Sequence, residues 1–141
     1  MIDRYSRKKM KSIWEEDSTF DIWLKIEIAT CKAWAETGLI SNSDMEKIKK
    51  AKFNKKSYDN WFSETKHDLV SFTRAVGESL GNEKRWIHHG LTSNDVKDTA
   101  LSLQLVNSLK IIDEDVKKLK DSIKKRAIEF KNTPCIGRSH G

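Results

Sequence analysis

The most regular feature of the sequence is a series of apolar residues at helical spacing after Thr92. Between Leu101 and Phe130, apolar side chains recur at steps of three and four among mostly charged positions. Because no glycine or proline interrupts Val96 to Thr133, the pattern predicts one helix about 55 Å long at a rise of ~1.5 Å per residue. A narrow apolar stripe of that length cannot be buried within 141 residues. The sequence therefore predicts a helical bundle completed by further sequence, by other subunits, or by both.

Shorter helical patterns precede the long one, so the expected fold is all-α. Ser6 and Ser18 stand where helices are expected to begin, and Gly38 stands where a C-cap glycine belongs. The predicted segments are helices over 6–16, 18–37 and 41–53, a connection over 54–60, a helical pattern over 61–80 that breaks near His67 and ends at Gly81, and an irregular segment over 82–91.

Composition supports a helical protein with a core. Six glycines and one proline leave little material for the turns of a many-stranded β protein, while 37% hydrophobic residues suffice for a core.

The net charge of +6 permits an anionic partner without requiring one. Two cysteines make neither a disulfide framework nor a zinc site, and they suit a reducing compartment. Since the N-terminus is charged and no stretch of ~20 residues is apolar, we expect a cytoplasmic protein without a membrane partner.

The last residues of the sequence are rich in polar chemistry, with Arg138, Ser139 and His140 standing between two glycines. The end of a natural chain is usually frayed and carries little function. We therefore expect the given sequence to be the N-terminal piece of a longer protein, ending within a working loop.

Thr92 and Asp95, at the start of the predicted long helix, have the spacing of a capping box with Asp in place of the usual Glu or Gln. One interpretation is a plain N-cap. In the other, free N–H groups, the hydroxyls of Thr92 and Ser93 and the positive helix end form a seat for a carboxylate or phosphate. Gly90 would let such a ligand approach the backbone closely. The pattern leaves both interpretations open.

All four histidines lie beside polar segments that we expect to be loops. Because histidine titrates near neutral pH, they are candidate general acids and bases. Adjacent His88 and His89 point apart on regular structure, and no pair has the spacing His-x-x-x-His, so we expect no metal site. Arg4 and Tyr5 form another candidate pair, because an arginine fork beside a phenol can hold a phosphate, although a surface arginine is the more frequent case.

Three motifs occur in order along the chain: Thr-Lys-His-Asp at 65–68, His-His-Gly-Leu-Thr-Ser-Asn-Asp-Val at 88–96 and Gly-Arg-Ser-His-Gly at 137–141. Together they resemble successive signatures of the adenylosuccinate lyase family, within the aspartase/fumarase superfamily. Residues 2–6 and 72–76 are also similar to bacterial members. Ser139 replaces a common threonine and His89 a frequent aromatic residue. The family's loop with the serine thought to act as base lies outside the given sequence.

The resemblance implies an all-α protein in which residues 1–92 form an N-terminal helical domain and 93–141 begin a central helical-bundle domain. It implies a homotetramer whose active sites each draw on three subunits, which agrees with the unpaired apolar stripe. The implied reaction releases fumarate from adenylosuccinate, giving AMP, and from the succinyl-aminoimidazole-carboxamide ribotide of purine biosynthesis. It uses no metal or organic cofactor. Without the base, the given sequence alone should be inactive.

The resemblance also assigns roles to residues. His140 would donate the proton to the leaving nitrogen. Arg4 and Tyr5 would bind the nucleotide part of the substrate, and Thr92 and Ser93 would seat a succinyl carboxylate at the helix start. The other candidates would line the substrate site: Lys66, His67 near the phosphate, Asp68, His88, Arg138 and Ser139.

Two alternatives stay open at the level of sequence. A related fumarate-releasing enzyme, such as argininosuccinate lyase, would share the elimination without a nucleotide phosphate, although the Arg4-Tyr5 pair and the motif at 65–68 favour the purine enzyme. A basic helical module could instead bind nucleic acid. Its lysines, concentrated in 8–11, 47–56 and 117–125, show no aromatic stacking platform, so we expect no nucleic-acid partner.

Overall fold

The computed structural model describes residues 2–140, and within that range it contains helices and no strands. The predicted all-α fold is confirmed. No helix of the described residues is long and apolar enough to cross a membrane. The elements, in chain order, are η1 (Asp3–Tyr5), α1 (Lys8–Ile13), α2 (Glu16–Glu36), α3 (Asn42–Ile48), α4 (Lys55–Thr65), α5 (Asp68–Gly77), η2 (Asn82–Trp86) and α6 (Ser93–Glu129), where η marks a 3-10 helix.

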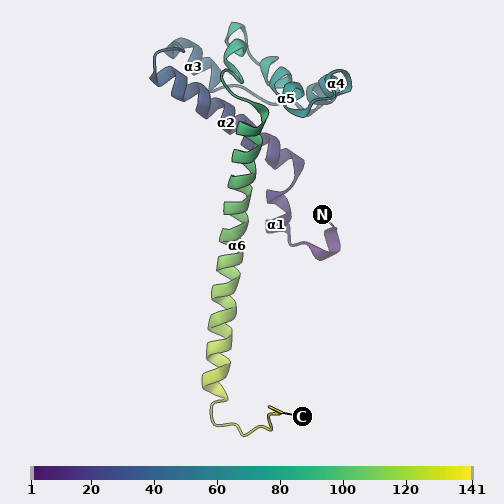
Figure 1. Ribbon diagram of the computed structural model, residues 1–141, viewed down its shortest axis with the longest axis vertical. Coiled ribbons are helices and arrows are strands. Elements are labelled where there is room, and N and C mark those ends of the chain that lie inside the picture. Colours follow the sequence, from purple (N-terminus) through teal and green to yellow (C-terminus); the bar gives the residue numbers. More distant parts are fainter. Residues whose placement is uncertain (1, 141) are drawn as a thin grey trace.

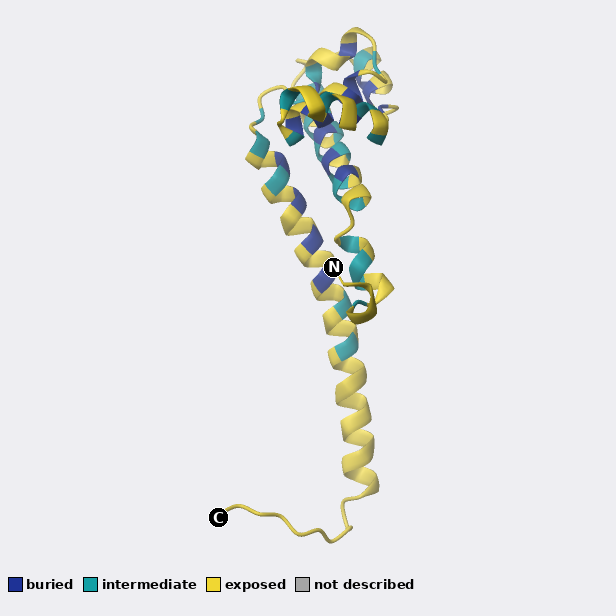
Figure 2. Ribbon diagram, turned by 90° about the vertical axis from the view of Figure 1, so that its right-hand side faces the viewer, coloured by how far each residue is buried: buried dark blue, intermediate teal, exposed yellow. Residues whose placement is uncertain are grey.

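The helices form a head around the start of one long helix. α2 to α5 gather near the first turns of α6, while the C-terminal half of α6 extends away from them without a neighbouring helix (Figure 1). α1 and the N-terminus lie beside α6 below the head. Buried residues follow the same division, because they occur in the head and along the first part of α6 and are absent from its far end (Figure 2).

Aromatic side chains make up the centre of the head. The Phe72 side chain of α5 is fully buried, stacks on Phe53 with ring centroids 5.2 Å apart and meets the edge of Trp23 at 5.3 Å. Phe20 of α2 packs against Tyr58 of α4, with centroids 4.7 Å apart. Such pairs contribute roughly 0.5–1.5 kcal/mol each beyond the burial of apolar area. The cluster holds α2, α4 and α5 together and so fixes the segments between them.

The first half of α6 belongs to the head, and the second half does not. Val96 and Ala100 are buried in the core, and the Gln104 amide donates to the Ile13 carbonyl at 2.9 Å. No residue of α6 after Ser108 is buried. The predicted long helix is therefore confirmed, and its apolar stripe is exposed at Leu101, Leu105, Leu109, Ile112, Val116, Leu119, Ile123 and Phe130.

Ion pairs attach the N-terminal segment to the middle of α6. Arg7 pairs with Asp115, and Lys9 Nζ lies 3.5 Å from Glu114 Oε2. Because η1 comes directly before Arg7, it is held near the middle of α6 and away from its first turn (Figure 1).

The predicted connection over 54–60 is wrong. Asn54 is the N-cap of α4, and its Oδ1 accepts from the Ser57 N–H at 3.0 Å. The helix then buries Tyr58 against the aromatic cluster while the residues around it stay polar. A single buried residue in the first turns gives too little apolar periodicity for the sequence to reveal the start of this helix.

Helix ends also differ from the prediction. α1 begins after Arg7, which makes no side-chain cap, and the Ser6 hydroxyl donates instead to the Asp3 carbonyl at 3.2 Å. α2 begins at Glu16, so Ser18 lies inside it. α3 ends at Ile48 and α5 at Gly77, both earlier than predicted. Each is followed by a turn in which backbone hydrogen bonds join residues three positions apart.

Candidate functional site

The candidate site residues lie at three levels along α6. Those nearest its start are Lys66, His67, Asp68, His88, Thr92 and Ser93; Arg4 and Tyr5 precede the segment that is attached to its middle; and Arg138, Ser139 and His140 follow its far end.

The predicted break in the fourth helical pattern is confirmed, and it presents Lys66 and His67. Lys66 adopts a left-handed conformation with φ +51°, and its N–H donates to the Phe62 carbonyl at 3.1 Å, which ends α4. His67 then caps α5, since its Nδ1 accepts from the Val70 N–H at 3.3 Å. A ring nitrogen that accepts carries no hydrogen, so the His67 hydrogen lies on Nε2.

Asp68 joins the start of α5 to the first turns of α6. Its carboxylate accepts from the N–H of the next residue, Leu69, at 2.7 Å and lies 2.6 Å from Lys97 Nζ. Partial burial acts to raise the pKa of the Asp68 carboxyl, but the hydrogen bonds from Lys97 and Leu69 outweigh it and hold the pKa below its ordinary value. The structure thus brings the segment 66–68 to the same helix start as Thr92 and Ser93.

The start of α6 carries the cap that the sequence predicts. The Asp95 carboxylate accepts from the Thr92 N–H at 2.8 Å, which is the side-chain half of a capping box. The remaining N–H groups of the first turn, beside the Ser93 hydroxyl, supply the positive end of the helix dipole. The free N–H groups of this turn can bind an anion. The Thr92 N–H is not one of them, because it already donates to Asp95.

Packing inside the head gives Gly90 a second reason to lack a side chain. Gly90 has φ +75°, and a Cβ at this position would lie 3.1 Å from Cζ2 of Trp34. The indole also donates from Nε1 to the His89 carbonyl at 3.1 Å. A side chain of α2 therefore fills the space in which a Cβ would stand. Gly90 remains exposed, and the approach of a ligand to its backbone stays a prediction.

His88 is bound to a buried carboxylate that sequence reasoning missed. Glu27 of α2 is fully buried, and its two oxygens lie 2.7 Å from the N–H and 2.7 Å from Nδ1 of His88. A signal for this contact exists in the sequence, because Glu27 falls between Trp23 and Cys31 on the buried face of α2. An acid on an apolar helical face indicates a buried polar partner.

Cys31, one turn along the same face, is a structural thiol. Its Sγ lies 3.4 Å from the Trp86 carbonyl oxygen. Burial, and secondarily the charge of Glu27, raises the pKa of the Cys31 thiol to about 11, so it is not a thiolate at neutral pH. Both cysteines of the described residues are free.

Arg4 and Tyr5 form an exposed pair. The Arg4 guanidinium lies over the Tyr5 ring at 4.6 Å from its centroid, and Tyr5 is 72% exposed. The arm that carries them is anchored by Arg7, whose hydrogen bond holds the pKa of the Asp115 carboxyl below its ordinary value. A planar cation stacked on a phenol is a suitable surface for an anionic or aromatic ligand.

Arg138, Ser139 and His140 lie on an extended, exposed segment that follows α6. α6 runs from Ser93 to Glu129, a length of about 55 Å at ~1.5 Å per residue. One chain therefore does not bring His140 to Thr92 and Ser93. In the part of the chain that the structure describes, no three His, Cys, Asp or Glu side chains are grouped to hold a metal ion.

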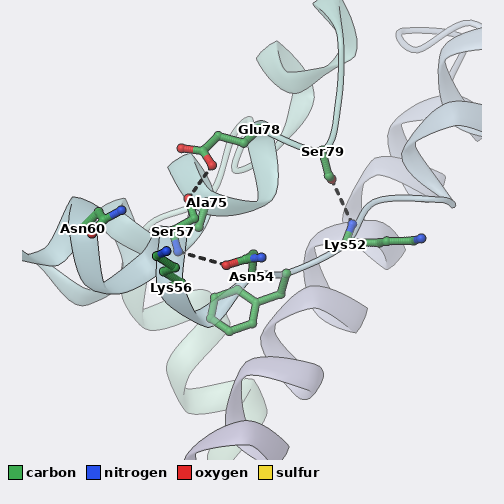
Figure 3. A pocket seen from close by; sticks show the side chains of 9 residues that line it. Lys52, Asn54, Lys56, Ser57, Asn60, Ala75, Glu78 and Ser79 are labelled. Atoms are coloured by element: carbon green, nitrogen blue, oxygen red, sulfur yellow. Dashed lines mark hydrogen bonds between the residues drawn. The ribbon is translucent and has the colours of Figure 1, made fainter.

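A polar pocket of about 500 Å³ lies elsewhere in the head, between the start of α4 and the end of α5 (Figure 3). Its polar groups are bound to one another: the Ser79 hydroxyl accepts from the Lys52 N–H at 2.9 Å, and Glu78 accepts from Ser57. None of the candidate residues lines it. These bonds connect the segments around the start of α4 and the end of α5, so we do not include the pocket in the candidate site.

A sequence profile of a family described as "Lyase" matches residues 3–141, and the chain belongs to this lyase family. Over 142 aligned residues it is 46% identical to the adenylosuccinate lyase of Bacillus subtilis (strain 168) and 46% identical to that of Helicobacter pylori (strain ATCC 700392 / 26695). These alignments cover 100% of this chain but 33% and 32% of the two enzymes. The chain thus spans about a third of the length of these relatives.

Two crystal structures show the same arrangement of helices. The chain superposes with a TM-score of 0.87 and 27% identity on the 3-carboxy-cis,cis-muconate lactonizing enzyme from Pseudomonas putida, covering 99% of this chain and 34% of that one. It superposes with a TM-score of 0.85 on the fumarate lyase from Mesorhizobium sp. BNC1, covering 96% and 34% at 20% identity, which is a likeness of fold alone.

Proposed function

We propose that this chain forms part of an adenylosuccinate lyase. The enzyme would eliminate fumarate from adenylosuccinate to give AMP, and from the succinyl-aminoimidazole-carboxamide ribotide in purine biosynthesis. The observation that carries the proposal is the 46% identity over the whole chain to two adenylosuccinate lyases. The three motifs at 65–68, 88–96 and 137–141 are the residues from which the same family was predicted.

The elimination has several steps, and residues of this chain can perform some of them. A base removes a proton beside a carboxylate, donors stabilise the negative charge that forms, and an acid protonates the leaving nitrogen. In our proposal His140 is the acid, and Thr92 and Ser93 seat the succinyl carboxylate at the positive end of α6. No metal or organic cofactor takes part.

The other candidates would bind the nucleotide part of the substrate. A dianionic phosphate is best held by charged donors, which give stronger hydrogen bonds than neutral ones. The residues proposed for this role, or for lining the site, are Arg4, Tyr5, Lys66, His67, Asp68, His88, Arg138 and Ser139.

A homotetramer with shared active sites follows from the same proposal. Two features of the chain support it: the candidate residues lie at three levels of a helix about 55 Å long, and the apolar stripe of that helix is exposed. Packing of several such helices could bring the far end of one chain to the start of another. We likewise propose residues 1–92 as a separate N-terminal domain, 93–141 as the start of the bundle domain, and a cytoplasmic, reducing location that suits the free cysteines.

A spectroscopic assay of the complete enzyme with several substrates tests the activity. We expect fumarate release from adenylosuccinate and from the succinyl-carboxamide ribotide, and none from argininosuccinate. Turnover of argininosuccinate without turnover of either purine substrate would assign the chain to the related lyase instead.

A further inference from the structure

Glu27 is a buried acid whose two oxygens bind the same residue. It is fully buried on the inner face of α2, where its neighbours on that face are Trp23 and Cys31. Its Oε2 accepts from the His88 N–H, and its Oε1 lies 2.7 Å from His88 Nδ1. A carboxylate is costly to bury unless hydrogen bonds satisfy it. Among the described residues, the hydrogen bonds of this buried acid therefore go to a single histidine.

The backbone of His88 is itself unusual. Its φ of +66° lies in the left-handed region, which side chains other than glycine seldom adopt. Such strain persists only where the surroundings hold it, and here the bond from the His88 N–H to Glu27 does so. A glycine would take this conformation without strain. The position nevertheless carries an imidazole, whose ring is 25% exposed beside the fully buried acid.

We propose that Glu27 is a positioning residue for His88, fixing both the place of the imidazole and its tautomer. A carboxylate can only accept hydrogen bonds, so the ring nitrogen that faces it must carry the hydrogen. The His88 hydrogen therefore lies on Nδ1, and Nε2 is the nitrogen left to meet a ligand. The use of Nε2 by the substrate rests on the proposed function, whereas the tautomer does not.

His67 has the opposite arrangement, which gives the inference a chemical consequence. The His67 Nδ1 accepts from the Val70 N–H at 3.3 Å, so its hydrogen lies on Nε2. In their neutral forms, His67 thus offers a donor and His88 an acceptor at Nε2. The two rings lie in the loops before α5 and α6, whose starts Asp68 and Lys97 connect. A substrate that contacts both rings, as the proposed function implies, would meet one ring of each kind.

Ring nitrogen NMR of the 141-residue chain tests the assignment directly. Long-range ¹H–¹⁵N spectra at about pH 8, where an ordinary imidazole is neutral, report which nitrogen carries the hydrogen. We expect the hydrogen on Nδ1 of His88 and on Nε2 of His67. If the chain self-associates, the same shifts can be read in the solid state. A His88 ring that carries its hydrogen on Nε2 alone would overturn the proposal.

The variant Glu27→Gln should reverse the tautomer of His88. The amide keeps the shape of the acid, its oxygen can still accept from the His88 N–H, and its NH₂ group then faces Nδ1 as a donor. The ring hydrogen should move to Nε2. An unchanged tautomer in a folded Glu27→Gln chain contradicts the proposal. If this variant does not fold, the spectrum of the unsubstituted chain decides alone.

Glu83→Gln is the matched control. Glu83 is also a buried acid, and it pairs with Lys47 instead of with a histidine. Its removal should leave the His88 tautomer unchanged. In the complete enzyme, Glu27→Gln should lower kcat/KM by roughly tenfold to a hundredfold through misplacement of the ring, and Glu83→Gln should not. An Nδ1–H tautomer in an enzyme that does not act on adenylosuccinate would uphold the assignment and reject the proposed function.

Discussion

At the scale of single residues, Asp68 joins segments that are far apart in the sequence. It follows the left-handed turn at Lys66, begins α5, and reaches Lys97 on α6 at 2.6 Å. The pKa of the Asp68 carboxyl lies below its ordinary value because the hydrogen bonds from Lys97 and Leu69 outweigh the effect of burial. One carboxylate therefore fixes the motif at 65–68 against the start of α6.

Asp68→Asn should lower stability in a pH-dependent way. A carboxyl whose pKa is depressed in the folded state contributes stability that is present above its unfolded pKa of about 4 and is lost as pH falls through the folded value. Because Asp68 is 39% exposed, we expect a loss of about 1 kcal/mol or less at pH 7. Urea unfolding at pH 7 and near pH 3 measures the difference, which should shrink in acid. An equal loss at both pH values would mean that the charge of Asp68 adds no stability, because asparagine keeps an oxygen that can accept from the Leu69 N–H.

His140→Ala tests the proposed acid. In the complete enzyme, kcat should fall by roughly a hundredfold or more, the scale of lost general-acid catalysis, while KM changes much less. Steady-state kinetics with adenylosuccinate provide both constants. Near-unchanged turnover would remove His140 from the acid role.

At the scale of elements, the start of α6 combines a structural cap with a candidate anion seat. Asp95 satisfies the Thr92 N–H at 2.8 Å, whereas Ser93 is the first residue of the helix proper. Thr92 belongs to both interpretations of the motif at 92–95, whereas Asp95 serves only the cap and Ser93 only the proposed seat. Substitutions can separate them.

Ser93→Ala should weaken substrate binding in the complete enzyme without a matching loss of stability. Asp95→Ala is the control, because it removes the Asp95 half of the capping box and should lower the free energy of unfolding by about 1 kcal/mol. Urea unfolding and KM measurements on both variants distinguish the roles. If Ser93→Ala changes only stability, while KM and kcat hold, the capping interpretation is sufficient.

Gly90→Ala should destabilise the head more than Gly38→Ala. Both glycines have positive φ, so an alanine at either is strained by about 1 kcal/mol or more. At Gly90 the new Cβ also meets the Trp34 ring at 3.1 Å, whereas at Gly38 nothing lies within 4 Å. Overpacking should add about 1 kcal/mol or more at Gly90. Equal losses in urea unfolding would mean that the indole moves aside without cost.

At the scale of the whole molecule, the main feature is a helix whose apolar stripe has no partner among the described residues. Leu109 and Leu119 are each 60% exposed. Most of the other apolar residues after Ser108 are exposed to a similar degree. Apolar area of this extent normally marks an interface. The head, in contrast, has a core of its own around Phe72.

The 141-residue chain alone should lack lyase activity and should self-associate. The base of the proposed reaction lies outside it, His140 sits near a free end, and the stripe of α6 lacks the rest of a bundle. Size-exclusion chromatography with light scattering and a fumarate assay measure both properties. The double variant Leu109→Lys and Leu119→Lys should reduce self-association and leave the head folded. A well-folded monomer that releases fumarate from adenylosuccinate is the contrary result.

The sequence by itself determined the features that depend on neighbouring residues. The uninterrupted stripe after Val96 predicted α6, the spacing of Thr92 and Asp95 predicted its cap, and the polar break at His67 predicted the boundary between α4 and α5. Helix periodicity and capping involve residues within a few positions of one another, so a linear pattern contains them. The motifs also sufficed for the family.

Only the tertiary structure decided which distant residues meet. The contacts of Glu27 with His88, Asp68 with Lys97 and Arg7 with Asp115 depend on how helices pack, and no local pattern specifies a partner. The first turns of α4 were missed for a related reason, because they bury a single side chain against a cluster built from other segments. The long α6 likewise separates His140 from Ser93 within one chain, since a helix is rigid and its length is fixed by its rise per residue.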